Sequence, residues 1–93
     1  MLFEWDEEKE RINYRKHKVR FSTAVRVFYD PNHIVRFDEA HSDDEDRYNA
    51  IGMVDNVLFV VFTERKERTR IISARVATNY ERKEYYDSLS SYS

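Results

Sequence analysis

Cysteine is absent from the 93-residue chain, and glycine and proline occur once each. Without cysteine there is no disulfide bond, zinc–thiolate site or thiol nucleophile. One glycine, Gly52, is too few for a phosphate-cradling loop, and the nucleophile elbow of serine hydrolases is missing too. The sequence also has no signal peptide and no apolar run of about 18 residues, which predicts a cytoplasmic protein without membrane contact.

Histidine is scarce as well, and its placement argues against a metal site. His17, His33 and His41 fall on a predicted helix end, a strand start and a loop, without the i, i+4 spacing of helical metal ligands. The most acidic stretch, residues 38–46, lacks the bend glycine of a calcium-binding loop. We therefore predict neither a metal ion nor another cofactor.

The remaining composition suits one folded domain. Hydrophobic residues make up 41% of the chain and aromatic residues 15%, which is enough for one core but, at this length, not for two. Residues 1–93 are therefore predicted to form a single domain, in which only the serine-rich tail 88–93 frays.

Charge is unevenly distributed, although the net charge is only -2. Residues 38–46 (DEAHSDDED), here called the acidic segment, contain six acidic residues and no Lys or Arg, so the rest of the chain carries +4. Residues 63–83 contain seven Lys or Arg side chains against three Glu. A basic surface for nucleic-acid phosphates is thus compatible with the low net charge, although solvated loops and faces produce the same runs.

Hydrophobic periodicity and cap signals predict an α+β domain. Two N-terminal helices are expected, one capped by Asp6 with an apolar stripe of Trp5, Ile12 and Val19, the other capped by Ser22. The strands are expected to form an antiparallel meander. The predicted order is a short strand at 2–4, helices at 6–18 and 23–29, strands at 33–38, 48–54, 57–63 and 68–76, and a closing helix from 78 to about 89.

Two further local signals complete the fold prediction. Thr78 and Glu81 have the spacing of a capping box at the start of the closing helix. Large aromatic side chains are assigned to the core rather than to a base-stacking platform: Trp5, Phe21, Phe28, Phe59 and Phe62.

The arginines of strand 68–76 are candidates for binding phosphate. Metal-free RNA cleavage needs a base for the 2′-hydroxyl proton, an acid for the leaving oxygen and cations for the phosphorane charge. Arg70 and Arg75, assisted by Arg47 on a neighbouring strand, can supply those cations. Because an odd number of positions separates Arg70 from Arg75, they lie on opposite faces of an ideal strand, and only a bulge or the strand's end brings them together.

Proton transfer falls to Lys16 or His17 at the end of the first helix, and the Tyr85 hydroxyl is a further candidate if it faces the same groove. Additional RNA contacts are assigned to Arg65, Arg68 and Arg82. The alternative is that the arginines only pair with Glu64, Glu67 or the acidic segment.

These residues belong to a longer pattern. The runs FEWDEEKERINYRKHKVRFSTAVRVFYDP, HSDDEDRYNAIG and VLFVVFTERKERTRIISARVATNYERKEYY strongly resemble the BrnT family of type II toxin-antitoxin toxins, in the same order and spacing over residues 3 to about 86. The resemblance implies a RelE-like fold and a metal-independent endoribonuclease that cuts RNA, inhibits translation and arrests growth. The positions that carry the family's polar pattern are Lys16, His17, His41, Ser42, Glu45, Arg47, Thr63, Glu64, Arg65, Arg70, Ser73, Arg75, Glu81, Arg82 and Tyr85.

The resemblance also implies partners. A BrnA-type antitoxin with a ribbon-helix-helix DNA-binding part would neutralise the toxin in a complex of two copies of each chain. This complex would repress its own operon, and the toxin would contact operator DNA only through the antitoxin. Two positions depart from the family pattern. Lys18 replaces the usual glycine after Lys16-His17, which can shift that pair, and Lys66 or Glu67 stands in a hairpin that often has glycine.

A competing interpretation is a non-catalytic interaction module, or an inactive toxin that only binds the antitoxin. In that case the acidic segment and the basic strand dock a partner protein by electrostatic attraction. The pattern leaves the assignment of acid and base open, together with the RNA sequence preference and the dependence on the ribosome.

Overall fold

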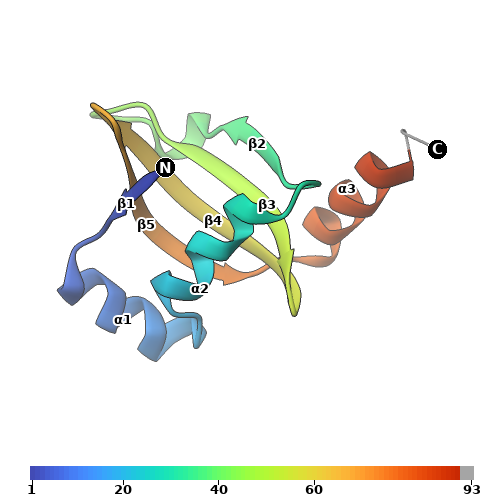
Figure 1. The fold of residues 1–93 in the computed structure, drawn as a ribbon, viewed down its shortest axis with the longest axis horizontal. Coiled ribbons are helices and arrows are strands. Elements are labelled where there is room, and N and C mark those ends of the chain that lie inside the picture. Colours follow the sequence, from blue (N-terminus) through green and yellow to red (C-terminus); the bar gives the residue numbers. More distant parts are fainter. Residues whose placement is uncertain (91–93) are drawn as a thin grey trace.

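The computed structural model describes residues 1–90, which form a five-stranded sheet with helices on both faces (Figure 1). The elements in chain order are β1 (Leu2–Glu4), α1 (Glu7–His17), α2 (Phe21–Val25), the 3-10 turn η1 (Arg26–Tyr29), β2 (Ile34–Phe37), the 3-10 turn η2 (Glu39–His41), β3 (Tyr48–Val54), β4 (Asn56–Arg65), β5 (Arg68–Val76) and α3 (Asn79–Ser90). This order confirms the α+β class and each predicted strand to within a few residues. Of the serine-rich tail, residues 88–90 form the last turn of α3, and 91–93 lie outside the described residues. No helix within 1–90 is long and apolar enough to cross a membrane.

The sheet has the strand order β1-β5-β4-β3-β2. Strands β2 to β5 pair antiparallel, as predicted, but β1 runs parallel to β5, with Leu2 beside Arg68 and Glu4 beside Arg70. The prediction of a purely antiparallel meander was therefore wrong. Short connections force the later strands to alternate in direction, whereas most of the domain separates β1 from β5 and leaves their relative direction free.

Helix α1 begins and ends at local signals. Asp6 caps it as predicted, because its carboxylate accepts from the backbone N–H groups of Glu8 and Lys9 at 2.9 and 3.1 Å. Lys18 ends it with φ of 59°, and Lys66 in the β4–β5 turn has φ of 56°. Both lysines, at positions where the resemblance leads us to expect glycine, thus have the left-handed conformation that glycine adopts most easily.

Two details of the helix predictions were wrong. Ser22 caps nothing, because α2 begins at Phe21, whose N–H donates to the Glu10 carboxylate of α1 at 2.9 Å. The apolar stripe packs only in part: Val19 is buried and Trp5 partly buried, but Ile12 is 52% exposed, and α1 turns Asn13 toward the sheet instead. Helix α1 lies along the edge of β5 beyond its short pairing with β1, where the β5 backbone needs hydrogen-bond partners that an apolar side chain does not supply.

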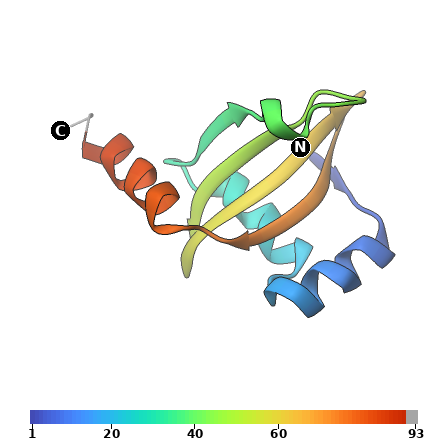
Figure 2. The same cartoon turned by 180° about the vertical axis from the view of Figure 1, so that it is seen from behind.

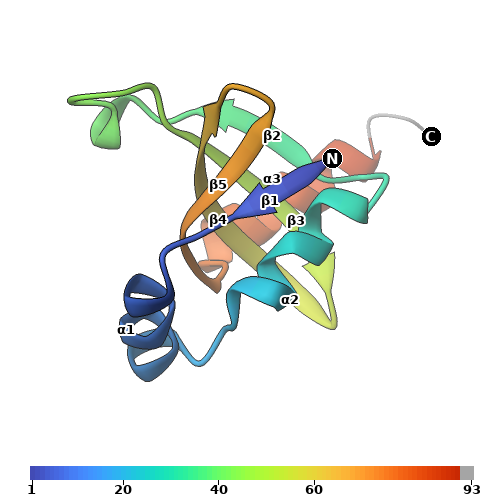
Figure 3. The same cartoon turned by 60° about the vertical axis from the view of Figure 1, so that its left-hand side comes forward.

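The two faces of the sheet are covered unequally. Helix α2 and η1 lie on one face, and α1 lies along the edge of β5; α3 lies against one end of the other face, here called the open face because no other helix of residues 1–90 covers it (Figures 2 and 3). The core on the first face is Val19, Phe21, Ala24, Val27, Ala50, Val54, Leu58, Val60, Phe62, Ile71 and Ala74, and that on the second is Ile51, Val57, Phe59, Val61, Ala77 and Tyr85. The predicted aromatic core is confirmed, with Trp5 and Phe28 partly buried against the first cluster.

Helix α3 is attached directly to the end of β5. The capping box is confirmed: the Thr78 N–H donates to Glu81 Oε1 at 2.8 Å, and the Glu81 N–H donates to Thr78 Oγ1 at 3.2 Å. This places Glu81 beside the open face of the sheet.

Candidate active site

A β-bulge in β5 places Arg70 and Arg75 on the same face of the sheet. Arg70 pairs with Thr63 and Arg75 with Phe59, although the arginines are five positions apart and their partners only four. The extra residue of β5 is Ile72. Positions four apart on β4 share a face, and directly paired residues do too, so both arginines lie on the face that α3 covers only at one end. The bulge that the sequence required is therefore present.

Each of these arginines is held by a carboxylate from another element. Arg70 donates to Glu4 of β1 at 3.0 Å, and Arg75 donates to both carboxylate oxygens of Glu81 at 2.8 and 3.0 Å. The Arg75 guanidinium also lies 4.1 Å from the centre of the Phe59 ring. Burial by itself would raise the pKa of Glu81, but hydrogen bonds from Arg75 and from the Thr78 backbone N–H outweigh it, and the pKa is lowered. The Arg75–Glu81 pair is thus charged at neutral pH.

Thr63 and Arg47 extend the polar face toward β3. Thr63 is buried, and its hydroxyl donates to the carbonyl of Asp46 at 2.7 Å, which holds the start of β3 beside β4. Arg47 follows directly, and within residues 1–90 its half-buried guanidinium has no ion pair or hydrogen bond. Because Asp46 is bonded to Thr63, and Thr63 pairs with Arg70, Arg47 lies at the Arg70 end of the sheet.

Lys16 and His17 lie at the outer edge of β5, beside the bulge. They line a groove of about 230 Å³ whose other residues are Lys9, Ile12, Asn13, Ile72 and Ser73. Ser73 pairs with Val61, so it is on the same face as Arg70 and Arg75. The structure thus brings the predicted proton carriers to the segment of β5 that separates the two arginines.

Asn13 fixes this position of α1. Its amide nitrogen donates to the carbonyls of Ala74 at 2.9 Å and Val19 at 3.1 Å, and its side-chain oxygen accepts from the Ala74 N–H at 3.1 Å. The side chain therefore pairs with the edge of β5 as a neighbouring strand would. Lys16 and His17 follow one helical turn later.

Tyr85 is the predicted site residue that the structure places elsewhere. It is 3% exposed, and its hydroxyl donates to the Asp30 carboxylate at 2.6 Å. Burial, followed by this hydrogen bond, raises the pKa of Tyr85 far above its ordinary value. Asp30 also accepts from the Met53 N–H at 2.8 Å, so Tyr85 joins α3 to the sheet. The expectation that the hydroxyl faces the groove was wrong, because the half-buried Asp30 carboxylate binds it.

The three predicted RNA-binding arginines are not brought together. Arg65 and Arg68 are paired at the β4–β5 turn, where Arg65 also contacts Glu45 of the acidic segment at 3.2 Å. Arg82 donates to Asn56, at the other end of β4. Nine positions separate those ends, or about 30 Å at roughly 3.3 Å per residue. Only Arg65 and Arg68 lie near Arg70.

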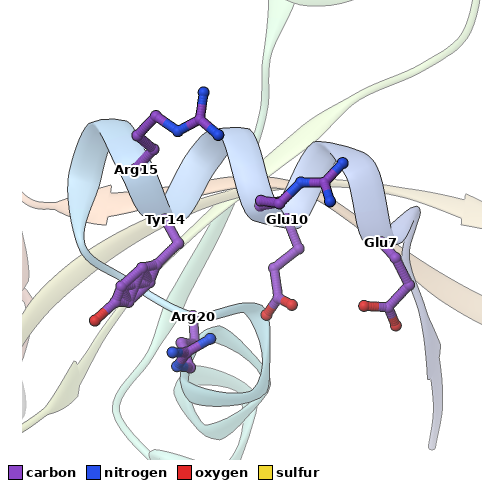
Figure 4. A pocket seen from close by; sticks show the side chains of 6 residues that line it. Glu7, Glu10, Tyr14, Arg15 and Arg20 are labelled. Carbon is purple, nitrogen blue, oxygen red and sulfur yellow. The ribbon is translucent and has the colours of Figure 1, made fainter.

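Figure 4 shows another groove, of about 460 Å³, between α1 and the start of α2. The Arg20 guanidinium lies 4.2 Å from the centre of the Tyr14 ring, and the Glu10 carboxylate accepts from the Phe21 N–H. These contacts join the two helices, and the groove does not reach the arginines of β5. Over the described part of the chain, no three His, Asp or Glu side chains are grouped to hold a metal ion.

Sequence reasoning missed three contributors to this site. Glu4 was assigned only to a short strand, and the alternative partners considered for the arginines were Glu64, Glu67 and the acidic segment. Asn13 was overlooked, although a polar residue of modest helix propensity in the middle of a helix is a signal for a buried amide contact. Ser73 was part of the family pattern, but only the bulge gives it a place between the arginines.

Comparison with known proteins adds an independent finding. No curated protein matches the chain. Residues 5–81 match the sequence model of a family described as the ribonuclease toxin, BrnT, of type II toxin-antitoxin systems. The matched range includes α1, the acidic segment and all of β2 to β5, and it ends at Glu81. Such toxins act with an antitoxin partner, and the chain belongs to the BrnT family of type II ribonuclease toxins.

Proposed function

We propose that the open face of the sheet is the site of RNA cleavage. The observation that carries the proposal is the bulge of β5, which gathers Arg70, Ser73 and Arg75 on one face. The groove of Lys16 and His17 opens beside the same segment. Cations and proton carriers therefore meet at one place, as phosphoryl transfer requires.

The proposed reaction is an internal transesterification. The 2′-oxygen of one nucleotide attacks the neighbouring phosphorus, and the bond from phosphorus to the 5′-oxygen breaks. A base takes the 2′-hydroxyl proton, an acid gives a proton to the departing 5′-oxygen, and cations stabilise the phosphorane between them. No metal ion is needed for this balance, so we propose cleavage that is independent of metal.

The spacing of the arginines assigns their roles. Their β4 partners are four positions apart, or about 13 Å, which is too far for Arg70 and Arg75 to grip one phosphate in the same way. We place the scissile phosphate over Ser73, with the two arginines on either side of it. Lys16 or His17 transfers the protons from the edge of β5, Arg47 assists at the Arg70 end, and Arg65 and Arg68 extend the RNA path. Tyr85 and Arg82 are left out because of where they lie.

The wider assembly is proposed from the family resemblance. We propose a RelE-like arrangement, a BrnA-type antitoxin with a ribbon-helix-helix part, two copies of each chain in the complex, and repression of the operon through antitoxin-bound DNA. Cleavage of RNA would inhibit translation and growth in the cytoplasm.

The test is cleavage of a synthetic single-stranded RNA by the purified chain in EDTA. We expect Arg70→Ala and Arg75→Ala each to lose on the order of 100-fold to 1,000-fold in rate, as when a donor to a developing oxyanion is removed. Lys16→Ala and His17→Ala separate the two proton carriers, and the stronger loss identifies the main one. Arg26→Ala is the matched control, because Arg26 is exposed on η1 on the other side of the sheet.

Two outcomes would count against the proposal. Wild-type cleavage in all four folded variants would remove the site assignment. No cleavage by the unmodified chain, together with tight antitoxin binding, would favour the inactive toxin or interaction module instead.

A further inference from the structure

An apolar groove opens on the face of the sheet opposite to Arg70 and Arg75. It has a volume of about 270 Å³, and it is lined by Met1, Phe28, His33, Val35, Tyr48, Phe62 and Glu64. Phe62 and Tyr48 stack at 5.7 Å, and Tyr48 contacts Phe37 edge-on at 5.7 Å. The groove continues the buried core past the end of η1, where neither α1 nor α2 covers it.

The groove reaches an open strand edge. Within residues 1–90, β2 is the last strand of the sheet and pairs only with β3, so no described strand lies beside its outer edge. Val35 and Phe37 of β2 point to the groove side and are 49% and 50% exposed. An unpaired edge beside exposed apolar side chains is the kind of surface that binds an extended peptide as an added strand.

Negative charge borders the same edge. The acidic segment follows Phe37 directly, and part of it is folded on itself: Asp38, 7% exposed, contacts His41 Nδ1 at 2.8 Å. Four of its carboxylates are exposed, and in residues 1–90 none of them has an ion-pair partner: Glu39, Asp43, Asp44 and Asp46. The surface is therefore apolar in the middle and acidic at one end.

We propose that the antitoxin binds here, through an extended segment that adds to the outer edge of β2. The segment places apolar side chains against Val35 and Phe37, and it carries Lys or Arg beside the acidic segment. Family membership supplies the partner, and the groove, the open edge and the exposed carboxylates supply its chemistry. The inference does not depend on which residues cleave RNA, because the groove and the arginines lie on opposite faces.

The test measures binding of the purified cognate antitoxin to the full chain by calorimetry. Phe37→Asp and Val35→Asp should each weaken binding by about 30-fold or more, the loss expected for an anchor at an interface. The double variant with Asp43→Lys and Asp44→Lys should also weaken antitoxin binding. Its loss of affinity should be larger at low salt than at high salt, because salt screens the charges. Val76→Asp is the matched control, since Val76 is 46% exposed at the end of β5, with two strands between it and β2, and Arg75→Ala should bind the antitoxin as the unmodified chain does.

Hydrogen exchange gives a second readout that does not rely on substitution. The backbone amides of residues 34–37 should become protected when the antitoxin binds. If Phe37→Asp does not fold, Phe37→Ser replaces it, because it removes the ring without burying a charge.

Three results would overturn the proposal. One is binding within twofold of the unmodified chain for folded Phe37→Asp and Phe37→Ser. A second is unchanged exchange at residues 34–37 in the complex. The third is a dimer of the chain alone that Phe37→Asp dissociates, which would assign the edge to a second copy. Loss of RNA cleavage in the arginine variants leaves all three readouts unchanged, so the two proposals fail separately.

Discussion

Replacing Asn13 tests how α1 is attached to the edge of the sheet. The side chain is 7% exposed and makes three hydrogen bonds, to the Val19 carbonyl, the Ala74 carbonyl and the Ala74 N–H. In Asn13→Ala these buried backbone groups lose their partner. In Asn13→Asp the Ala74 N–H keeps its acceptor, but a carboxylate then lies against two carbonyl oxygens.

The expected loss follows from the number of bonds. At about 1 kcal/mol each, three hydrogen bonds give a loss of about 3 kcal/mol in the free energy of unfolding for Asn13→Ala. A domain of this size is typically stable by about 5–15 kcal/mol, so the variant should still fold while its Tm falls by roughly 10–25 °C. Asn13→Asp should be less stable than Asn13→Ala at pH 7, because the buried carboxylate has no donor other than one N–H.

Urea unfolding followed by circular dichroism measures these changes, with Asn32→Ala as the control because Asn32 is exposed. Below the transition, Asn13→Ala should also cleave RNA more slowly, since α1 carries Lys16 and His17 to β5. A change in unfolding free energy of less than about 0.5 kcal/mol for Asn13→Ala, or an Asn13→Asp variant more stable than Asn13→Ala at pH 7, would refute this reasoning.

Two further measurements address the helix end and the hydrogen-bonded carboxylates. Lys18 already has a left-handed φ of 59°, which glycine adopts with less strain. Lys18→Gly should therefore stabilise the fold by about 0.5–1 kcal/mol in thermal unfolding and leave RNA cleavage unchanged. A loss of stability would mean that the lysine side chain contributes more than its backbone strain costs. The folded-state pKa of Glu81 lies below its ordinary 4.5, so its contribution to stability is complete above pH 4.5 and is lost as the pH falls through the folded value. The pKa values of Asp30 and Asp38 are also lowered: burial opposes the shift, and hydrogen bonds from Tyr85 and His41, respectively, lead the effects that outweigh it. From pH 6 to pH 2 the free energy of unfolding should therefore decrease, and it should decrease less steeply in Glu81→Gln than in the unmodified chain. Equal slopes in the two proteins would contradict the lowered pKa of Glu81.

Local signals account for most of what could be predicted from the sequence. Asp6 and the Thr78–Glu81 pair cap their helices, because a cap acts within three or four residues. The strands at 48–54 and 68–76 were predicted with their observed bounds. Apolar residues occupy both faces of the first strand, and apolar and polar residues alternate along the second. Charge counted by segment predicted a basic sheet beside an acidic segment, and the chemistry excluded by the missing cysteines and glycines follows from composition alone.

Contacts between distant segments escaped prediction. The parallel pairing of β1 with β5 and the Glu4–Arg70 ion pair join residues 66 positions apart, and no pattern within β1 indicates its partner. Tyr85 was placed in the groove because its helix signals do not reveal Asp30, which is 55 positions away. Asn13 was overlooked for the same reason, since its partner Ala74 is 61 positions away.

By itself, then, the sequence determined the element types, the caps, the core aromatics and the residues able to bind phosphate or carry protons. Only the tertiary structure decided which of those residues share a face. The side-chain period of a strand is two, so a single extra residue reverses the face of everything after it. Ile72 is that residue in β5. It brings Arg75 to the face of Arg70 and places Ser73 between them. The groove of Lys16 and His17 lies beside the same residues, so they belong to the same site.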